Sequence, residues 1–275
     1  MNSKKRNQRI VLAAWLGLFF FITIFLLTSA FVNTAYAEPV RDVFYFIMGV
    51  VTVTVLIVAA VKSRGHDKKV WILIASAGAL WAIGDLSLRI CELTGMFGPK
   101  RVFCVPDIFY LTSYVFLVAL VVSLGRATEK PGLRFKWVKF YPFAVIVVSI
   151  IISVVMAIFL PHGVAASIVR TPGVDFSLFV NYLYTALDVC VVAGLSVIIL
   201  VHRTHFNRLW EALLVLGLSV FTIADLSYSL FKPAGIYDPV NLPTQIIIAM
   251  WLGAYGLLSM AAVYKLTENT ELIST

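Results

Sequence analysis

Two aspartates in matching surroundings are the residues best suited to chemistry in this sequence. Asp85 stands in W-A-I-G-D-L-S and Asp225 in F-T-I-A-D-L-S, each within a long apolar run. At about 1.5 Å of rise per helical residue, each acid lies roughly 22 Å along its run from the more basic end. A charge exposed to lipid at such a depth costs about 2.5 to 3.5 kcal/mol. We therefore expect both carboxyl groups to face protein or water, either as an outward-opening site for a ligand, ion or proton or as structural bonds between helices.

Aromatic residues lie one helical turn from each acid. Helical spacing puts Trp81 one turn inward of Asp85 and Phe221 one turn inward of Asp225, where the two rings would form the floor of a cavity. Tyr228 shares a face with Asp225 and is a candidate hydrogen-bond partner for it. These positions predict an aromatic surround for both acids.

An ion pair is the structural alternative for Asp85, because Arg89 follows it by four residues. Ser229 stands at the matching position after Asp225. Such a pair therefore cannot account for both acids.

A third aspartate, Asp188, lies in the middle of a later apolar run, in N-Y-L-Y-T-A-L-D. Asn181 and Tyr184 precede it at helical spacing, so the three side chains share one face. Met48 stands 140 residues earlier, at the matching position of the first half of the chain. The polar face either lines a pocket or forms a seam between packed helices.

The other reactive residue types form no enzyme pattern. The three cysteines include no C-x-x-C pair, and a disulfide between Cys91 and Cys104 stays open. His202 and His205 lie in a basic loop without a nearby carboxylate or thiolate, and no histidine or lysine lies mid-span to hold haem or retinal. No phosphate-binding glycine loop, zinc-protease helix or G-x-S-x-G turn is present. We expect neither a metal site nor enzyme activity, and the cofactor content is unknown.

The elements that position these residues must be membrane helices. Of the 275 residues, 61% are hydrophobic and 13% are charged, with a mean hydropathy of +0.95, whereas about a quarter of residues are charged in a soluble domain. The net charge of +8 is spread over short runs between apolar stretches. This distribution disfavours a nucleic-acid partner, which needs a basic face or stripe, and favours the anionic headgroups of a lipid bilayer.

Eight apolar runs reach the roughly 20 residues that a helix needs to cross a bilayer. The first is longer than a signal-peptide core of about 7 to 15 residues, so we expect it to be retained. Short connections with Gly or Pro separate most of the runs. The predicted spans are residues 10–32, 43–61, 70–94, 105–125, 138–160, 176–201, 209–231 and 242–264.

Lys and Arg residues are divided unevenly between the two sides of the predicted bundle. Sixteen lie in the segments of one side and six in those of the other. Because positive loops resist translocation, we expect a multi-pass protein of the cell membrane with both termini in the cytoplasm.

The sequence matches itself at an offset of 140 residues. Residues 80–99 (LWAIGDLSLRICELTGMFGP) align with residues 220–239 (VFTIADLSYSLFKPAGIYDP), with identities at six positions. Such internal repetition predicts two parallel four-helix repeats, residues 1–134 and 135–275, in one membrane domain. The predicted fold class is an all-α integral membrane protein of about eight transmembrane helices.

The segment W-A-I-G-D-L-S, a Gly-Pro turn and V-P-D-I-F-Y-L-T-S-Y-V-F-L from Val105 to Leu117 resemble a membrane-embedded sensor region. In some bacterial and archaeal signalling proteins this region precedes a GGDEF, EAL or histidine-kinase domain. The run W-L-G-A-Y-G-L-L-S-M-A-A from Trp251 to Ala262 resembles its closing helix. The residues that carry the resemblance are Trp81, Gly84, Asp85, Pro106, Asp107, Tyr110, Leu111 and Tyr114.

The resemblance implies a non-enzymatic sensory or small-ligand-binding module. Because the sequence ends at Thr275, soon after the last predicted span, we expect it to act through a signalling partner, and a homo-oligomer stays open. A transporter for a small solute or ion is the alternative, since parallel repeats and intramembrane carboxylates suit alternating access. The candidate ligand-binding residues are Asp85, Asp225, Trp81, Tyr228, Asp188, Tyr184 and Asp107.

Overall fold

The computed structural model describes residues 34–95, 104–127, 137–159, 176–202, 209–231 and 242–273, and four single residues of the first predicted span, Trp15, Gly17, Phe20 and Ile24. Apart from short turns, the six ranges consist of seven α-helices and contain no strand. The first predicted span thus falls outside the described ranges, and each of the other seven corresponds to one helix. The helices are α2 (Thr34–Lys62), α3 (Gly65–Leu93), α4 (Val105–Ala127), α5 (Trp137–Phe159), α7 (Phe176–His202), α8 (Leu209–Phe231) and α9 (Leu242–Ile273).

Six of the described helices are long and apolar enough to cross a membrane, namely α2, α3, α4, α7, α8 and α9. The apolar part of α5 is shorter and covers Phe140–Ser153. This finding confirms the predicted all-α membrane fold in its general form.

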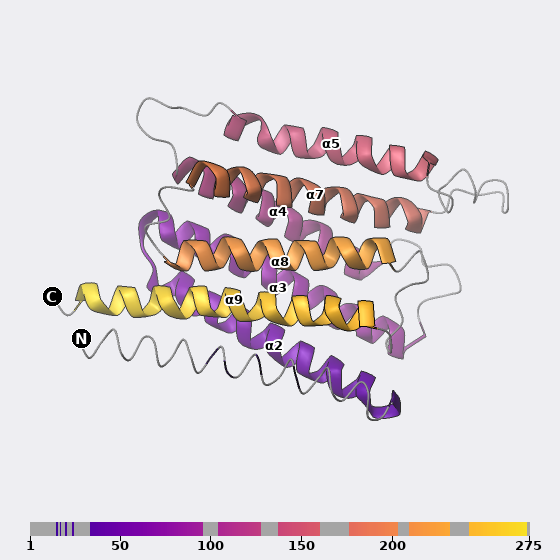
Figure 1. Ribbon diagram of the computed structural model, residues 1–275, viewed down its shortest axis with the longest axis horizontal. Helices are drawn as coiled ribbons and strands as arrows, with labels where there is room; N and C mark the ends of the chain where they lie inside the picture. The colour runs from indigo at the N-terminus through magenta and orange to yellow at the C-terminus, as the bar shows by residue number, and fades with distance from the viewer. Residues whose placement is uncertain are drawn as a thin grey trace.

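The six long helices form a closed ring of two layers. One layer consists of α2, α3 and α4 side by side, and the other of α7, α8 and α9. Contacts between α4 and α7 join the layers at one edge, and contacts between α2 and α9 join them at the other. Figure 1 shows α7, α8 and α9 in front of α4, α3 and α2, with α5 along the outer edge, where it packs on α7 and α4.

The two ends of the ring differ in charge. At one end, here called the basic end, α2 passes into α3 through a two-residue connection, and Gly65 takes a left-handed φ of 57° that favours glycine. Four basic residues lie around this connection, Lys62, Arg64, Lys68 and Lys69. At the opposite end, here called the far end, α3 ends and α4 begins.

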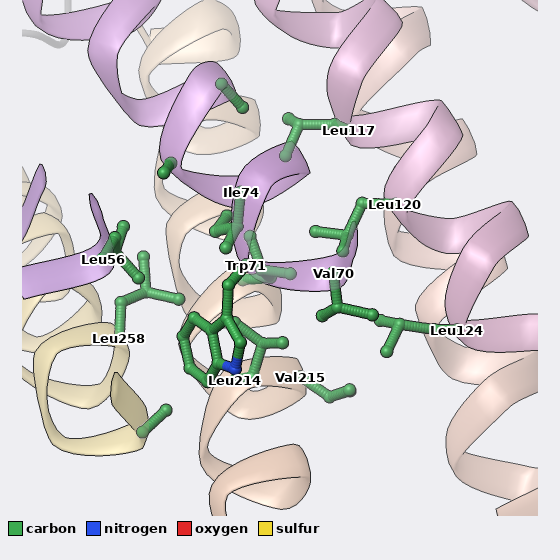
Figure 2. Close-up of a cluster of buried hydrophobic side chains, with 14 of the residues drawn as sticks. Leu56, Val70, Trp71, Ile74, Leu117, Leu120, Leu124, Leu214, Val215 and Leu258 are labelled. Atoms are coloured by element: carbon green, nitrogen blue, oxygen red, sulfur yellow. The ribbon is translucent and has the colours of Figure 1, made fainter. Parts of the chain in front are cut away.

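Large apolar side chains fill the ring in the half nearer the basic end. Trp71 of α3 and Trp210 of α8 are almost fully buried, with their ring centroids 5.4 Å apart. Figure 2 shows leucines of four helices around Trp71. The labelled residues are Leu56, Val70, Trp71, Ile74, Leu117, Leu120, Leu124, Leu214, Val215 and Leu258.

A buried lysine ties α9 to α3 at the basic end. Lys265 Nζ lies 2.6 Å from Asp67 Oδ2 and 3.1 Å from Glu268 Oε2. The same ammonium group lies 5.3 Å from the ring centroid of Trp210. A buried charge needs such partners because its desolvation is otherwise uncompensated.

Candidate functional site

The repeated I-x-D-L-S segments turn both acids toward the interior of the ring. Ile83 and Ile223 are 44% and 41% exposed, so this side of each helix lies on the outer surface of the ring. Residues two positions apart lie about 200° apart around a helix, which directs Asp85 and Asp225 away from that side. Both acids are half-buried.

The serines of these segments donate their hydrogen bonds to the backbone and not to the acids. Ser87 Oγ donates to the carbonyl of Ile83 at 2.7 Å, and Ser227 Oγ donates to that of Ile223 at 2.8 Å. Each serine thus bonds to its own helix one turn back.

Each of the two acids accepts a hydrogen bond from an aromatic side chain of the following helix. Tyr110 Oη on α4 donates to Asp85 Oδ1 at 2.7 Å. Trp251 Nε1 on α9 donates to Asp225 Oδ1 at 2.6 Å. The donors are 25 and 26 residues beyond their acceptors, so the two halves of the chain build nearly the same contact with different side chains.

Gly84 makes room for the first of these contacts. A Cβ atom at position 84 would lie 2.5 Å from Cε1 of Tyr110 and 2.8 Å from its Cδ1. The tyrosine ring therefore lies directly on the backbone of α3, and any larger residue would push it away.

Two reciprocal hydrogen bonds join α4 and α7. Tyr114 Oη of α4 donates to Asp188 Oδ1 of α7 at 2.6 Å, and Tyr184 Oη of α7 donates to Asp107 Oδ1 of α4 at 2.8 Å. Asp107 also accepts the backbone N–H of Cys104 through Oδ2 at 2.8 Å. This second bond satisfies a free N–H at the start of α4 in the manner of a capping box, so Asp107 has a structural role.

Aromatic rings surround the three interior acids, Asp85, Asp188 and Asp225. Between the layers, Trp81 of α3 and Phe221 of α8 pack edge to face, with their ring centroids 4.8 Å apart. Trp81 also packs on Tyr114, with ring centroids 5.5 Å apart, and Phe221 packs on Tyr255, with ring centroids 5.7 Å apart. We call the whole set the aromatic box, and its members are Tyr45, Trp81, Tyr110, Tyr114, Tyr184, Phe221, Trp251 and Tyr255.

Two of the interior acids keep an unpartnered oxygen. The Oδ2 atoms of Asp188 and Asp225 are buried, and neither has a hydrogen-bond partner among the described residues. Asp188 is 1% exposed as a whole residue. Because a buried polar atom without a partner costs about 1 to 3 kcal/mol, these oxygens require an explanation.

The interior acids also act on one another electrostatically. Asp225 lies near enough to both Asp188 and Asp85 for their charges to repel. Arg89 attracts Asp85, but within the described ranges no Lys or Arg side chain pairs with Asp188 or Asp225. The site therefore has an excess of potential negative charge.

The described residues contain no group of three or more His, Cys, Asp or Glu side chains placed to hold a metal ion. Cys91, Cys104 and Cys190 form no disulfide with one another. His205 lies outside the described residues.

The structure brings five of the seven predicted site residues close to one another. Asp85, Asp225 and Asp188 lie inside the ring with Trp81 and Tyr184. Asp107 lies nearer the far end, where it accepts a hydrogen bond from Tyr184. Tyr228, the predicted hydrogen-bond partner of Asp225, packs on Trp251 with ring centroids 5.5 Å apart. The donor to Asp225 Oδ1 is the indole N–H of Trp251.

Six members of the aromatic box were not among the seven predicted site residues. Phe221 was predicted only as part of a cavity floor, and Tyr110 and Tyr114 only as carriers of the resemblance. The other three are Tyr45, Trp251 and Tyr255. Two signals could have found the residues of α9. Trp251 and Tyr255 are four residues apart and share a helix face, and position 250 is the register partner of Tyr110. Tyr45 carries no such signal in the sequence.

Comparisons of the chain with models of protein families, with curated proteins and with solved structures give no match. The geometry of the site must therefore carry the functional interpretation.

Proposed function

We propose that this chain is a non-enzymatic sensory module that binds a small molecule inside its helix ring and passes the event to a partner protein. The observation that carries the proposal is the pair of buried, unpartnered carboxylate oxygens of Asp188 and Asp225 within the aromatic box. Most buried side-chain polar atoms have a hydrogen-bond partner, so two unpartnered carboxylate oxygens in the same site favour a bound group over a purely structural role. The resemblance of the W-x-x-G-D and Tyr-rich segments to sensor regions points the same way.

Helix α9 is suited to transmit binding to the basic end. It carries Trp251 and Tyr255 at the site and, at the basic end, Lys265, whose ion pair with Asp67 we call the clasp. Its 32 residues span about 48 Å, which exceeds a bilayer core of about 30 Å. A small rotation or shift of this helix at the aromatic box would therefore change the geometry at the basic end.

We further propose the finer topology of eight spans, two parallel repeats, a plasma-membrane location and cytoplasmic termini. The contacts support the repeats, because exchanging α2, α3 and α4 with α7, α8 and α9 maps the ring's contacts onto one another. The basic end is the cytoplasmic side by the positive-inside rule. A reporter fused after residue 275 should score as cytoplasmic, and an external score would reject this orientation.

A thermal-unfolding screen tests the ligand-binding function. The purified full chain would be heated in detergent with small metabolites of positive, neutral and negative charge. Because a ligand that binds only the folded state stabilises it, we expect at least one class to raise the Tm of the wild type but not of Asp188→Asn/Asp225→Asn. If every compound shifts both proteins equally, the proposal is wrong.

Transport remains the second candidate, because the unpartnered acids lie within a ring of membrane helices between its two ends. Uptake of the stabilising compound into proteoliposomes separates the two functions. Uptake that the Asp188→Asn/Asp225→Asn variant abolishes would favour a transporter, and binding without uptake would favour a sensor.

A further inference from the structure

We propose that the aromatic box binds an organic ammonium cation, whose charge lies near Asp188 and Asp225 and whose carbon groups contact Trp81, Tyr114 and Phe221. This inference rests on the proposed function and specifies the chemical class of its ligand. Three independent observations lead to it: the charge of the site, its aromatic lining and the absence of metal-binding geometry.

The charge of the site favours a cation. Asp188 and Asp225 act on each other electrostatically, and no Lys or Arg in the described ranges pairs with either. Each keeps one buried oxygen without a partner. A positively charged ligand compensates both oxygens by its charge, and one that carries N–H groups also donates hydrogen bonds to them. An anion would be repelled, and an uncharged apolar ligand would leave the oxygens unsatisfied.

The lining favours a cation that carries carbon groups. Trp81, Phe221 and Tyr114 form a continuous aromatic contact between the two layers, with centroid separations of 4.8 and 5.5 Å. Tyr114 Oη also donates a hydrogen bond to Asp188 Oδ1 at 2.6 Å. One of the three rings is therefore directly bonded to one of the acids. Indole and phenol faces attract ammonium groups through their quadrupoles, most strongly where water is excluded.

The spacing of the acids disfavours an inorganic ion. Ions such as Ca²⁺ need six or more oxygen ligands at about 2.3 to 2.6 Å. No group of three acidic or other ligating side chains in the described part of the chain is close enough to form such a shell. An organic cation needs no such shell, because it spreads its charge over a larger volume and contacts rings as well as carboxylates.

The test uses the full chain in dodecyl maltoside with phosphatidylglycerol, because phosphatidylcholine itself carries a quaternary ammonium group. Choline, tetramethylammonium and phenethylammonium chloride are the probes, so that both quaternary cations and a cation with N–H groups are tested. Sodium chloride controls for ionic strength, and 3,3-dimethylbutan-1-ol is the uncharged analogue of choline. Binding is measured by calorimetry and by the fluorescence of the tryptophans. We expect at least one probe to bind about tenfold or more tightly than its uncharged analogue.

Variants then locate the binding. Asp188→Asn and Asp225→Asn should each weaken it by about tenfold or more. Each asparagine keeps the oxygen that accepts from Tyr114 or Trp251, so the helices should still pack. Glu211→Gln is the matched control, since it removes a carboxylate from the first turn of α8, well away from Asp225, and should leave the affinity unchanged.

Two results would overturn the inference: no probe binds up to about 10 mM, or the asparagine variants bind the cations as well as the wild type does. These results differ from failure of the proposed function. If a neutral or anionic compound from the screen binds and needs Asp188 and Asp225, the ligand class is wrong and the sensory function stands. If no compound of any class depends on these residues, both proposals fail.

Discussion

Tyr110 reaches Asp85 because Gly84 leaves space for its ring on the surface of α3. At the residue scale, small side chains thus position the site as much as acids do. In the second half of the chain Ala224 stands before Asp225 and is fully buried, and the larger indole of Trp251 takes the place of the tyrosine. The two acids therefore have matching roles but different neighbours.

Gly84→Ala should displace Tyr110 and weaken its bond to Asp85. Forcing one extra carbon into a packed contact costs about 1 to 3 kcal/mol, and we expect a loss of that size in the free energy of unfolding, measured by SDS titration in mixed micelles. Gly253→Ala is the matched control, because a Cβ there would meet no atom within 4 Å. Equal effects of the two substitutions would contradict the contact.

Trp251→Phe should leave Asp225 without its hydrogen bond. Losing one partner of a buried polar pair costs about 1 to 3 kcal/mol, whereas replacing both partners by apolar groups costs much less. In an Asp225→Leu background the same substitution should therefore cost at least about 1 kcal/mol less in the free energy of unfolding. Additive losses in this double-mutant cycle would mean that the bond contributes nothing.

At the element scale, Lys265 is the residue that connects α9 to the start of α3. Lys265→Ala removes the partner of Asp67 and the contact with Trp210. Breaking one partner of a fully buried ion pair costs about 3 to 5 kcal/mol. Because the Asp67 side chain is 21% exposed, we expect Lys265→Ala to lower the free energy of unfolding by somewhat less, about 2 to 4 kcal/mol. Lys68→Ala removes an exposed lysine from the same end of α3 and should change stability by about 0.5 kcal/mol or less. Equal losses in thermal unfolding would contradict the clasp.

The helices could be predicted from the sequence far better than their contacts. Apolar runs long enough to cross a bilayer found all seven described helices, because lipid forces the backbone to bond within each helix. The inward direction of Asp85 and Asp225 also followed from the cost of exposing a carboxylate to lipid.

The partners of the acids depend on how the helices rotate against one another, which the sequence does not specify. Tyr228 was the predicted neighbour of Asp225 on its own helix, and the donor to Oδ1 is Trp251 of α9. Asp188 could be placed on a helix face, but its bond to Tyr114 requires the contact between α4 and α7. This contact joins residues 74 positions apart and has no local signal.

At the scale of the whole molecule, closure of the ring depends on the contact between α2 and α9. Thr52 Oγ1 and Ser259 Oγ lie 3.0 Å apart in this buried contact. In a background without Cys91, Cys104 and Cys190, Thr52→Cys/Ser259→Cys should form a disulfide on mild oxidation, detected by mass spectrometry. Thr54→Cys/Ser259→Cys is the control, because Thr54 is exposed and bonds to its own helix. Equal yields from the two pairs would argue against a closed ring.

Native mass spectrometry of the purified full chain tests most directly whether Asp188 and Asp225 hold a small molecule inside the ring. Wild type and Asp188→Asn/Asp225→Asn would be released from the same detergent under the same conditions. We expect the wild type to retain a small molecule, seen as a discrete added mass, and the variant to have lost it, because the variant lacks the two carboxylates that would hold the ligand. Identical spectra from the two proteins, with or without an added mass, would contradict a binding site at these acids.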